Sequence, residues 1–154
     1  MNGYTETHRS RPLILGTGAL PVGEHWGLSI REIAGRAVRL ALADAGNPVP
    51  DAIYIGNAFG TILSQQANLG ALVSEYAGYP GIESCTFEAA GASGAAAFRA
   101  ACQAVQSGYV DVAVALGLEK ITECEDTRAA EIANLELNYE FETSQGLTTP
   151  MQAA

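Results

Sequence analysis

The sequence predicts an α/β domain in which helices cover a mainly parallel β-sheet. Three observations carry this prediction. Four short apolar runs, typical of buried strands, alternate with helix-like segments in the order β-α-β-α-β-α-β-α. Right-handed crossovers between parallel strands would place those helices on the faces of the sheet. The 154 residues are enough for one such domain with a real core, and too few for two.

The first strand and the first helix have clear signals. The strand is expected over residues 12–20 (PLILGTGAL), an apolar run that contains two glycines. The helix is expected to start at Ser29, because Ser29 and Glu32 match a capping box. Gly46 and Pro48 then end it. The residues of its apolar face, spaced three or four apart, are Ile30, Ile33, Ala34, Ala37, Val38 and Ala41.

The later elements continue the alternation. Strands are expected over 52–59 and around 83–90, with a helix near 65–77 between them. A further helix follows residues 91–94 (GASG). The apolar residues on its expected buried face are Ala95, Phe98, Cys102 and Val105. The last strand covers 111–118 (DVAVALGL), a continuous apolar run that predicts cover on both faces.

Polar segments flank this core. Residues 1–11 are expected to form a flexible N-terminus. Residues 119–142 hold eight acidic residues against Lys120 and Arg128, and a solvated helix is expected near 127–137. An acidic face that binds a partner is the alternative interpretation of this segment.

Composition argues against several classes of protein. A net charge of −9 opposes binding to nucleic acid or to an anionic membrane. No apolar run reaches the ~18 residues of a membrane span, and the N-terminus lacks the layout of a signal peptide. Cys85, Cys102 and Cys124 are spaced for neither a metal site nor a disulfide framework. We therefore expect a cytoplasmic protein with reduced thiols, no metal, and no nucleic-acid or membrane partner.

Two glycine-containing segments could carry chemistry. Residues 16–18 (GTG) do not match a dinucleotide-binding motif, because Pro21 stands where the third glycine belongs, so a structural turn is expected. Residues 87–101 (FEAAGASGAAAFRAA) place a tight turn between a strand and a helix, near free backbone N–H groups. Enzymes use such a turn to present a nucleophile and stabilise an oxyanion. The alternative is that its glycines merely permit a tight turn and close contact between helix and sheet.

Residues 88–101 (EAAGASGAAAFRAA) and 107–122 (SGYVDVAVALGLEKIT) resemble the thiolase family, especially its archaeal and bacterial acyl-CoA thiolase-like branch. The resemblance extends to the first helix, to 55–74 and to 139–150. It implies a Claisen-type reaction, in which acyl-CoA acylates a cysteine at the strand–helix turn and a second acyl-CoA condenses with it, or the reverse. It also implies acyl-CoA as a substrate, no cofactor, a role in lipid metabolism and a homo-oligomer. The corresponding substrate and oxyanion turn consists of Gly91, Ala92, Ser93 and Gly94.

The chain departs from the family in two ways. Gly91 occupies the position of the nucleophilic cysteine, and glycine has no side chain that could form an acyl-enzyme. Cys85 and Cys102 lie too far along the chain to replace it, and Ser93 is expected to cap the helix. The resemblance also covers only the N-terminal part of the family. The last strand of the N-terminal half, the loop region and the C-terminal half, which supplies a histidine and a second cysteine, have no counterpart.

Residues 12–154 are therefore expected to form a partial thiolase-like N-terminal domain, an incomplete α/β fold with an exposed sheet edge and apolar face. Three interpretations remain open. The chain is the N-terminal part of an acyltransferase whose remainder lies on another polypeptide, or a homologue without the cysteine that binds acyl-CoA or performs retro-aldol chemistry. The third is a non-catalytic oligomerisation subunit that needs a larger thiolase-like partner chain. In each case we expect the isolated chain to be inactive as a thiolase.

Overall fold

The computed structural model describes residues 11–124, 126–148 and 151. The predicted flexible N-terminus over residues 1–11 lies, apart from Arg11, outside the described residues. The start of the domain at residue 12 therefore stays a prediction.

Within the residues that the structure describes, three parallel strands form the sheet, in the order β2-β1-β3. They are β1 (Ala52–Gly56), β2 (Glu83–Phe87) and β3 (Ala113–Gly117). The register aligns the last residues of all three, so their carboxyl ends meet at one edge of the sheet. The predicted α/β class with a parallel sheet is confirmed, with three strands where four were expected.

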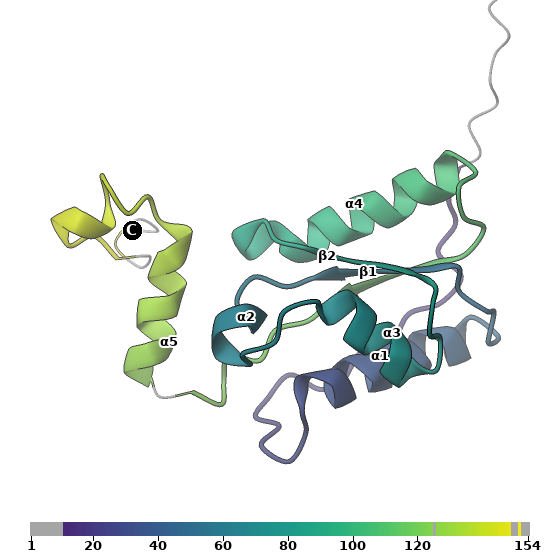
Figure 1. Cartoon of the computed structure of the whole chain (residues 1–154), viewed down its shortest axis with the longest axis horizontal. Coiled ribbons are helices and arrows are strands. Elements are labelled where there is room, and N and C mark those ends of the chain that lie inside the picture. Colours follow the sequence, from purple (N-terminus) through teal and green to yellow (C-terminus); the bar gives the residue numbers. More distant parts are fainter. Residues whose placement is uncertain (1–10, 125, 149–150, 152–154) are drawn as a thin grey trace, which may run out of the picture.

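Helices cover both faces of the sheet (Figure 1). On one face, α1 (Ile30–Asp44) and α3 (Leu69–Ala77) pack with the strands into a core cluster. On the other face, α4 (Ser93–Gln106) packs on β1 and β3. The strand residues of the first cluster are Ile53, Ile55, Val114 and Leu116. The central strand β1 is therefore buried along its whole length.

The capping signals of α1 are confirmed. The Glu32 carboxylate accepts hydrogen bonds from the backbone N–H (2.7 Å) and the hydroxyl (2.8 Å) of Ser29. The backbone hydrogen bond from Ser29, followed by the hydroxyl, lowers the pKa of Glu32. Gly46 follows the helix with φ +84°, a conformation that glycine adopts without strain. The second predicted helix, α3, ends before Gly78 as expected but begins four residues later than predicted, and α2 (Gly60–Leu63) precedes it.

The prediction of a strand over residues 12–20 is wrong. This segment is extended, but within the described residues no backbone hydrogen bond joins it to β3. It lies against α1 instead, where Thr17 donates its N–H to Asp44 (2.8 Å). A Cβ on Gly16 or Gly18 would collide with the α1 backbone, so these glycines serve a close approach between segments. Apolar content predicted a strand, but a strand also needs a hydrogen-bonded neighbour.

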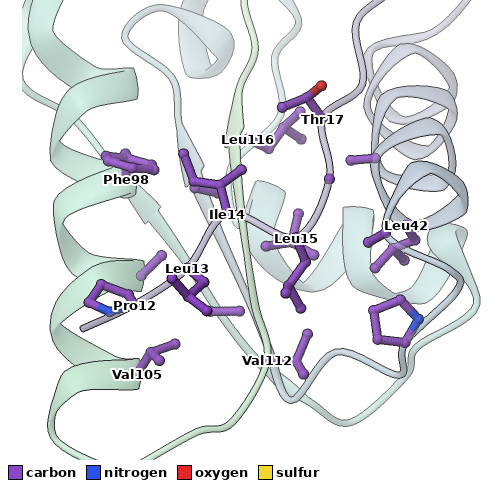
Figure 2. Close-up of a pocket in the computed structure, with 18 of the residues that line it drawn as sticks. Pro12, Leu13, Ile14, Leu15, Thr17, Leu42, Phe98, Val105, Val112 and Leu116 are labelled. Carbon is purple, nitrogen blue, oxygen red and sulfur yellow. The ribbon is translucent and has the colours of Figure 1, made fainter. Parts of the chain in front are cut away.

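A groove of about 690 Å³ separates residues 12–18 from β3, between α1 and α4. Figure 2 shows apolar side chains from the segment, α4 and β3 facing this space. Leu13, Ile14 and Leu15 are 80%, 72% and 59% exposed. The expected sheet edge and exposed apolar face are therefore present here.

Two predictions of buried faces are also wrong. In α4 the buried residues are Ser93, Ala97 and Ala101, while Phe98 is exposed and lines the groove. The helix lies so close to the sheet that small residues face it. Strand β3 alternates between buried and less buried residues, because the groove leaves part of one face uncovered.

The acidic segment contains α5 (Asp126–Ala133), followed by short 3-10 turns at Asn134–Glu136 and Thr143–Gln145. The predicted helix near 127–137 is thus present but shorter. In Figure 1 these elements stand beside the sheet, away from the helices that cover it. None of the described helices has the length and apolar character needed to cross a bilayer.

Tyr54 is expected to make the folding stability of the chain depend on pH in the alkaline range. Its side chain is 4% exposed, and its hydroxyl donates to Glu83 (2.6 Å). Burial, and then this hydrogen bond, raise the pKa of Tyr54 above its ordinary value. The raised pKa contributes stability that is complete below pH ~10 and is lost as pH rises further, because the unfolded tyrosine ionises first. We expect Tyr54→Phe to flatten the fall of Tm above pH ~10, measured by circular dichroism.

Tyr109 shares the Glu83 carboxylate, and that hydrogen bond raises the pKa of Tyr109 as well. The slope of Tm against pH above pH ~10 should therefore become smaller in Tyr54→Phe but should not reach zero. Tyr139→Phe, at a side chain that is 76% exposed, is the control and should keep the original slope. An unchanged slope in Tyr54→Phe would contradict the prediction.

Candidate functional site

The turn between β2 and α4 lies at the sheet edge where the three strands end. A 3-10 turn (Ala90–Ala92) leads from this edge into α4. Ala90 has φ +48°, a left-handed conformation that costs a non-glycine residue free energy. Its N–H donates to the Glu88 carboxylate (2.6 Å). Strained backbone of this kind concentrates at functional turns.

The four predicted site residues are adjacent, but they differ in exposure. Gly91, Ala92 and Gly94 are exposed, whereas Ser93 is 5% exposed. The Ser93 hydroxyl accepts the N–H of Ala89 (2.9 Å) and donates to the carbonyl of Ala90 (2.7 Å). Ser93 is the first residue of α4, not its N-cap, which is Ala92. The predicted capping role is therefore corrected: the hydroxyl closes the preceding turn.

A glycine at the end of β1 permits the close approach of this turn to the sheet. A Cβ on Gly56, the last residue of β1, would collide with the backbone of Ser93 and Gly94. A Cβ on Gly94 would lie 3.9 Å from the Cα of Gly117 at the end of β3. The start of α4 thus rests directly on the ends of two strands. The turn is exposed, but the clash that marks a close approach falls on Gly56 in β1, because a Cβ on Gly91 or Gly94 would meet no atom closer than 3.9 Å.

Position 91 has room for a side chain. A Cβ built on Gly91 meets no atom within 4 Å, and its backbone does not lie in the left-handed region. A cysteine would therefore fit there without moving the turn. With glycine in place, the turn offers backbone groups alone at this position, and acylation of residue 91 is chemically impossible.

None of the three thiols belongs to this turn. Cys85 is exposed in the middle of β2, and Cys102 lies in α4. Cys124 is partly buried, and its thiol donates to the carbonyl of Ile121 (3.0 Å). The structure therefore places no thiol at the turn over residues 91–94.

A polar network that the sequence did not predict lies beside the turn. Asn57 follows β1, and its Nδ2 donates to the carbonyl of Leu118 (2.8 Å) and to Glu119 (3.1 Å). The segment 55–74 was noted for its resemblance, but an asparagine after a strand is too common to indicate a role. The only local signal was a polar residue directly after a fully apolar strand.

Comparison with known proteins adds the family. The profile of the thiolase N-terminal domain matches residues 14–153. The acetyl-CoA acetyltransferase of Methanothermobacter thermautotrophicus is 37% identical over 139 residues, covering 89% of this chain and 36% of that protein. The acetyl-CoA acetyltransferase of Methanocaldococcus jannaschii is 34% identical over 139 residues, covering 89% of this chain and 35% of that protein. The chain therefore spans about a third of the length of these relatives.

Proposed function

Because this chain belongs to the thiolase family, we propose that it is the N-terminal part of a thiolase-like acyl-CoA acyltransferase of the acetyl-CoA acetyltransferase type, inactive when isolated. The observation that carries this proposal is the exposed turn over residues 91–94. It has the placement that presents a nucleophile, and glycine in place of the nucleophile. Acyl-CoA enters as the substrate, and no cofactor is proposed.

The chemistry of the proposed site follows from the turn. A nucleophile at position 91 would attack the thioester carbonyl of acyl-CoA, forming an acyl–enzyme bond and releasing CoA. Backbone N–H groups at the start of α4 would stabilise the negative charge on the thioester oxygen. The present chain retains these backbone groups, and it lacks the nucleophile.

The groove beside β3 supports the proposal that further polypeptide completes the fold. Strand β3 is an edge of the sheet, and residues 12–18 run along the far side of the groove. An apolar strand inserted between them would meet unpaired backbone on β3 and cover Leu13 and Ile14. We propose that it comes from the remainder of a thiolase, on the same or another polypeptide.

A second candidate is a non-catalytic subunit that binds acyl-CoA or stabilises a larger thiolase-like partner chain. Gly91 favours it, because the turn is kept while the reacting group is absent. A homologue without the cysteine that performs retro-aldol chemistry belongs to the same group. Co-purification with a larger thiolase-like chain would distinguish a subunit from an isolated fragment. A cytoplasmic location is part of both proposals.

Gly91→Cys is expected to fold normally and yet restore no thiolysis of acetoacetyl-CoA in the isolated chain. The turn accommodates a side chain there, but the histidine and second cysteine implied by the family are missing. The measurement is release of acetyl-CoA from acetoacetyl-CoA and CoA. Turnover by the isolated variant would contradict the prediction.

A complementation experiment tests the proposed function itself. The C-terminal two thirds of the Methanothermobacter relative, co-expressed with Gly91→Cys, should yield a complex with acetyl-transfer activity. The same complex with Gly91 is the matched control and should be inactive. An assembled Gly91→Cys complex without turnover would count against a reacting turn at residues 91–94.

We further expect the purified chain to form dimers or to aggregate, because β2 and β3 are open edges and the groove is apolar. Light scattering after size-exclusion chromatography measures the mass. A stable, monodisperse monomer would contradict this expectation.

A further inference from the structure

Asn57 links the carboxyl ends of the strands, with its backbone bonded to the end of β2 and its side chain to the residue after β3. Asn57 directly follows β1 and is 5% exposed. Its backbone N–H donates to the carbonyl of Phe87, the last residue of β2 (3.0 Å). Its Nδ2 donates to the carbonyl of Leu118, which follows β3 (2.8 Å). Its Oδ1 accepts the N–H of Gly60 (2.8 Å). Through the bonds to Phe87 and Leu118, this one buried residue contacts the ends of both strands that flank β1.

Glu119 completes this arrangement. Its Oε1 accepts a hydrogen bond from Asn57 Nδ2 (3.1 Å), and its Oε2 accepts the N–H groups of Ala58 (2.9 Å) and Phe59 (3.1 Å). Hydrogen bonds to an ionised carboxylate are stronger than those between neutral groups. Asn57 and Glu119, 62 residues apart, therefore hold the loop after β1 against the end of β3. The pair is named the strand-end clamp.

The strand-end clamp adjoins the residues on which the site turn packs. Gly56, the residue before Asn57, contacts the backbone at the start of α4. Phe87, whose carbonyl Asn57 holds, is the residue from which the turn departs. Gly117, which lies opposite Gly94, is two residues before Glu119. The residues that support the turn are thus one or two positions from the clamp, or bonded to it.

We propose that Asn57 is a positioning residue for the turn over residues 91–94, and that Glu119 acts with it. This inference rests on the proposed function, because it takes the turn as the place where residue 91 meets acyl-CoA. Removing the Asn57 amide leaves the carbonyl of Leu118 and the carboxylate of Glu119 without this donor. The loop after β1 then shifts, and the backbone N–H groups at the start of α4 lose their alignment with position 91.

A thiol at position 91 of the 154-residue chain reports that alignment. In the Gly91→Cys variant, the rate of alkylation by iodoacetamide is measured across pH, and the modified residue is assigned by peptide mass. We expect a midpoint below ~8.5, the pKa of an ordinary thiol, because a helix N-terminus stabilises the thiolate. Adding Asn57→Ala should move the midpoint back up to that value. The exposed Cys85 is the internal reference, with one midpoint in both variants.

The outcomes separate this inference from the proposed function. If the thiol at position 91 titrates as an ordinary thiol while Asn57 is intact, the proposed function loses its reacting turn and the inference falls with it. If the midpoint is low and Asn57→Ala leaves it unchanged in a folded chain, the positioning role alone is overturned.

Glu119 provides the second variant if Asn57→Ala does not fold. Glu119 is exposed, so Glu119→Ala removes its three acceptor contacts with less risk to the core. The midpoint should again rise, and Glu119→Gln, which keeps an oxygen for Ala58 and Phe59, should return it toward the low value. A midpoint that stays low in folded Glu119→Ala overturns the positioning role.

Discussion

Ile53→Ala is expected to lower the free energy of unfolding by about 2–5 kcal/mol. Ile53 lies in the central strand with 0% of its surface exposed, within the cluster that joins the sheet to α1 and α3. Truncation removes buried apolar surface and leaves a cavity that packed neighbours fill only in part. Since domains of this size are stabilised by only ~5–15 kcal/mol, the loss should be plain in urea unfolding monitored by circular dichroism.

Ile14→Ala is the matched control for this change. Ile14 is 72% exposed in the groove, so its truncation should change stability by less than ~0.5 kcal/mol in the isolated chain. Equal losses of stability in Ile53→Ala and Ile14→Ala would contradict the placement of Ile53 inside the core and of Ile14 outside it. In the complemented complex, Ile14→Ala should become costly, because an inserted strand would bury this side chain.

Gly56→Ala is expected to destabilise the chain by about 1–3 kcal/mol and to displace the site turn. The added methyl group would overlap the backbone of Ser93 and Gly94, and backbone cannot rotate away as a flexible side chain does. Strand β1 and the start of α4 must therefore separate. The measurement is the urea midpoint, with the thiol titration of the Gly91→Cys background as a readout of the turn.

Gly91→Ala is the matched control, because it adds the same methyl group within the turn itself, at a position where it meets no atom within 4 Å. Its stability should stay within ~0.5 kcal/mol of the original chain. If the two alanine variants lost equal stability, the close contact between Gly56 and α4 would be refuted.

The elements with local signals could be predicted from the sequence. The start of α1 depends on Ser29 and Glu32, three residues apart, and its end depends on Gly46. The same holds for the end of α3 before Gly78. These interactions lie within one helical turn, so their residues can be found without knowing the rest of the fold.

Two predictions that depended on a distant neighbour were wrong. Residues 12–20 are apolar enough for a strand, but strand pairing is decided by a partner elsewhere, and here the groove separates the segment from β3. The face of α4 was predicted from its largest apolar residues. Its distance from the sheet instead selects Ala97 and Ala101 for burial and leaves Phe98 at the groove.

The candidate site likewise combines features that the sequence predicts with features that it does not. Its motif, residues 91–94 between a strand and a helix, was visible in the sequence, as were the resemblance to the thiolase family and the glycine at position 91. The closure of the turn by Ser93, in place of the predicted cap, depends on the local backbone path through Ala90.

The sequence by itself determined the fold class, the helix ends with capping residues, the family and the glycine at position 91. Only the tertiary structure decided which faces are buried, how closely Gly56 approaches the turn, and how Asn57 meets Glu119. The physical reason is how far apart along the chain the interacting residues lie. Caps and turns are satisfied by residues a few positions apart, whereas the strand-end clamp joins residues 62 positions apart that meet only when the parallel strands align.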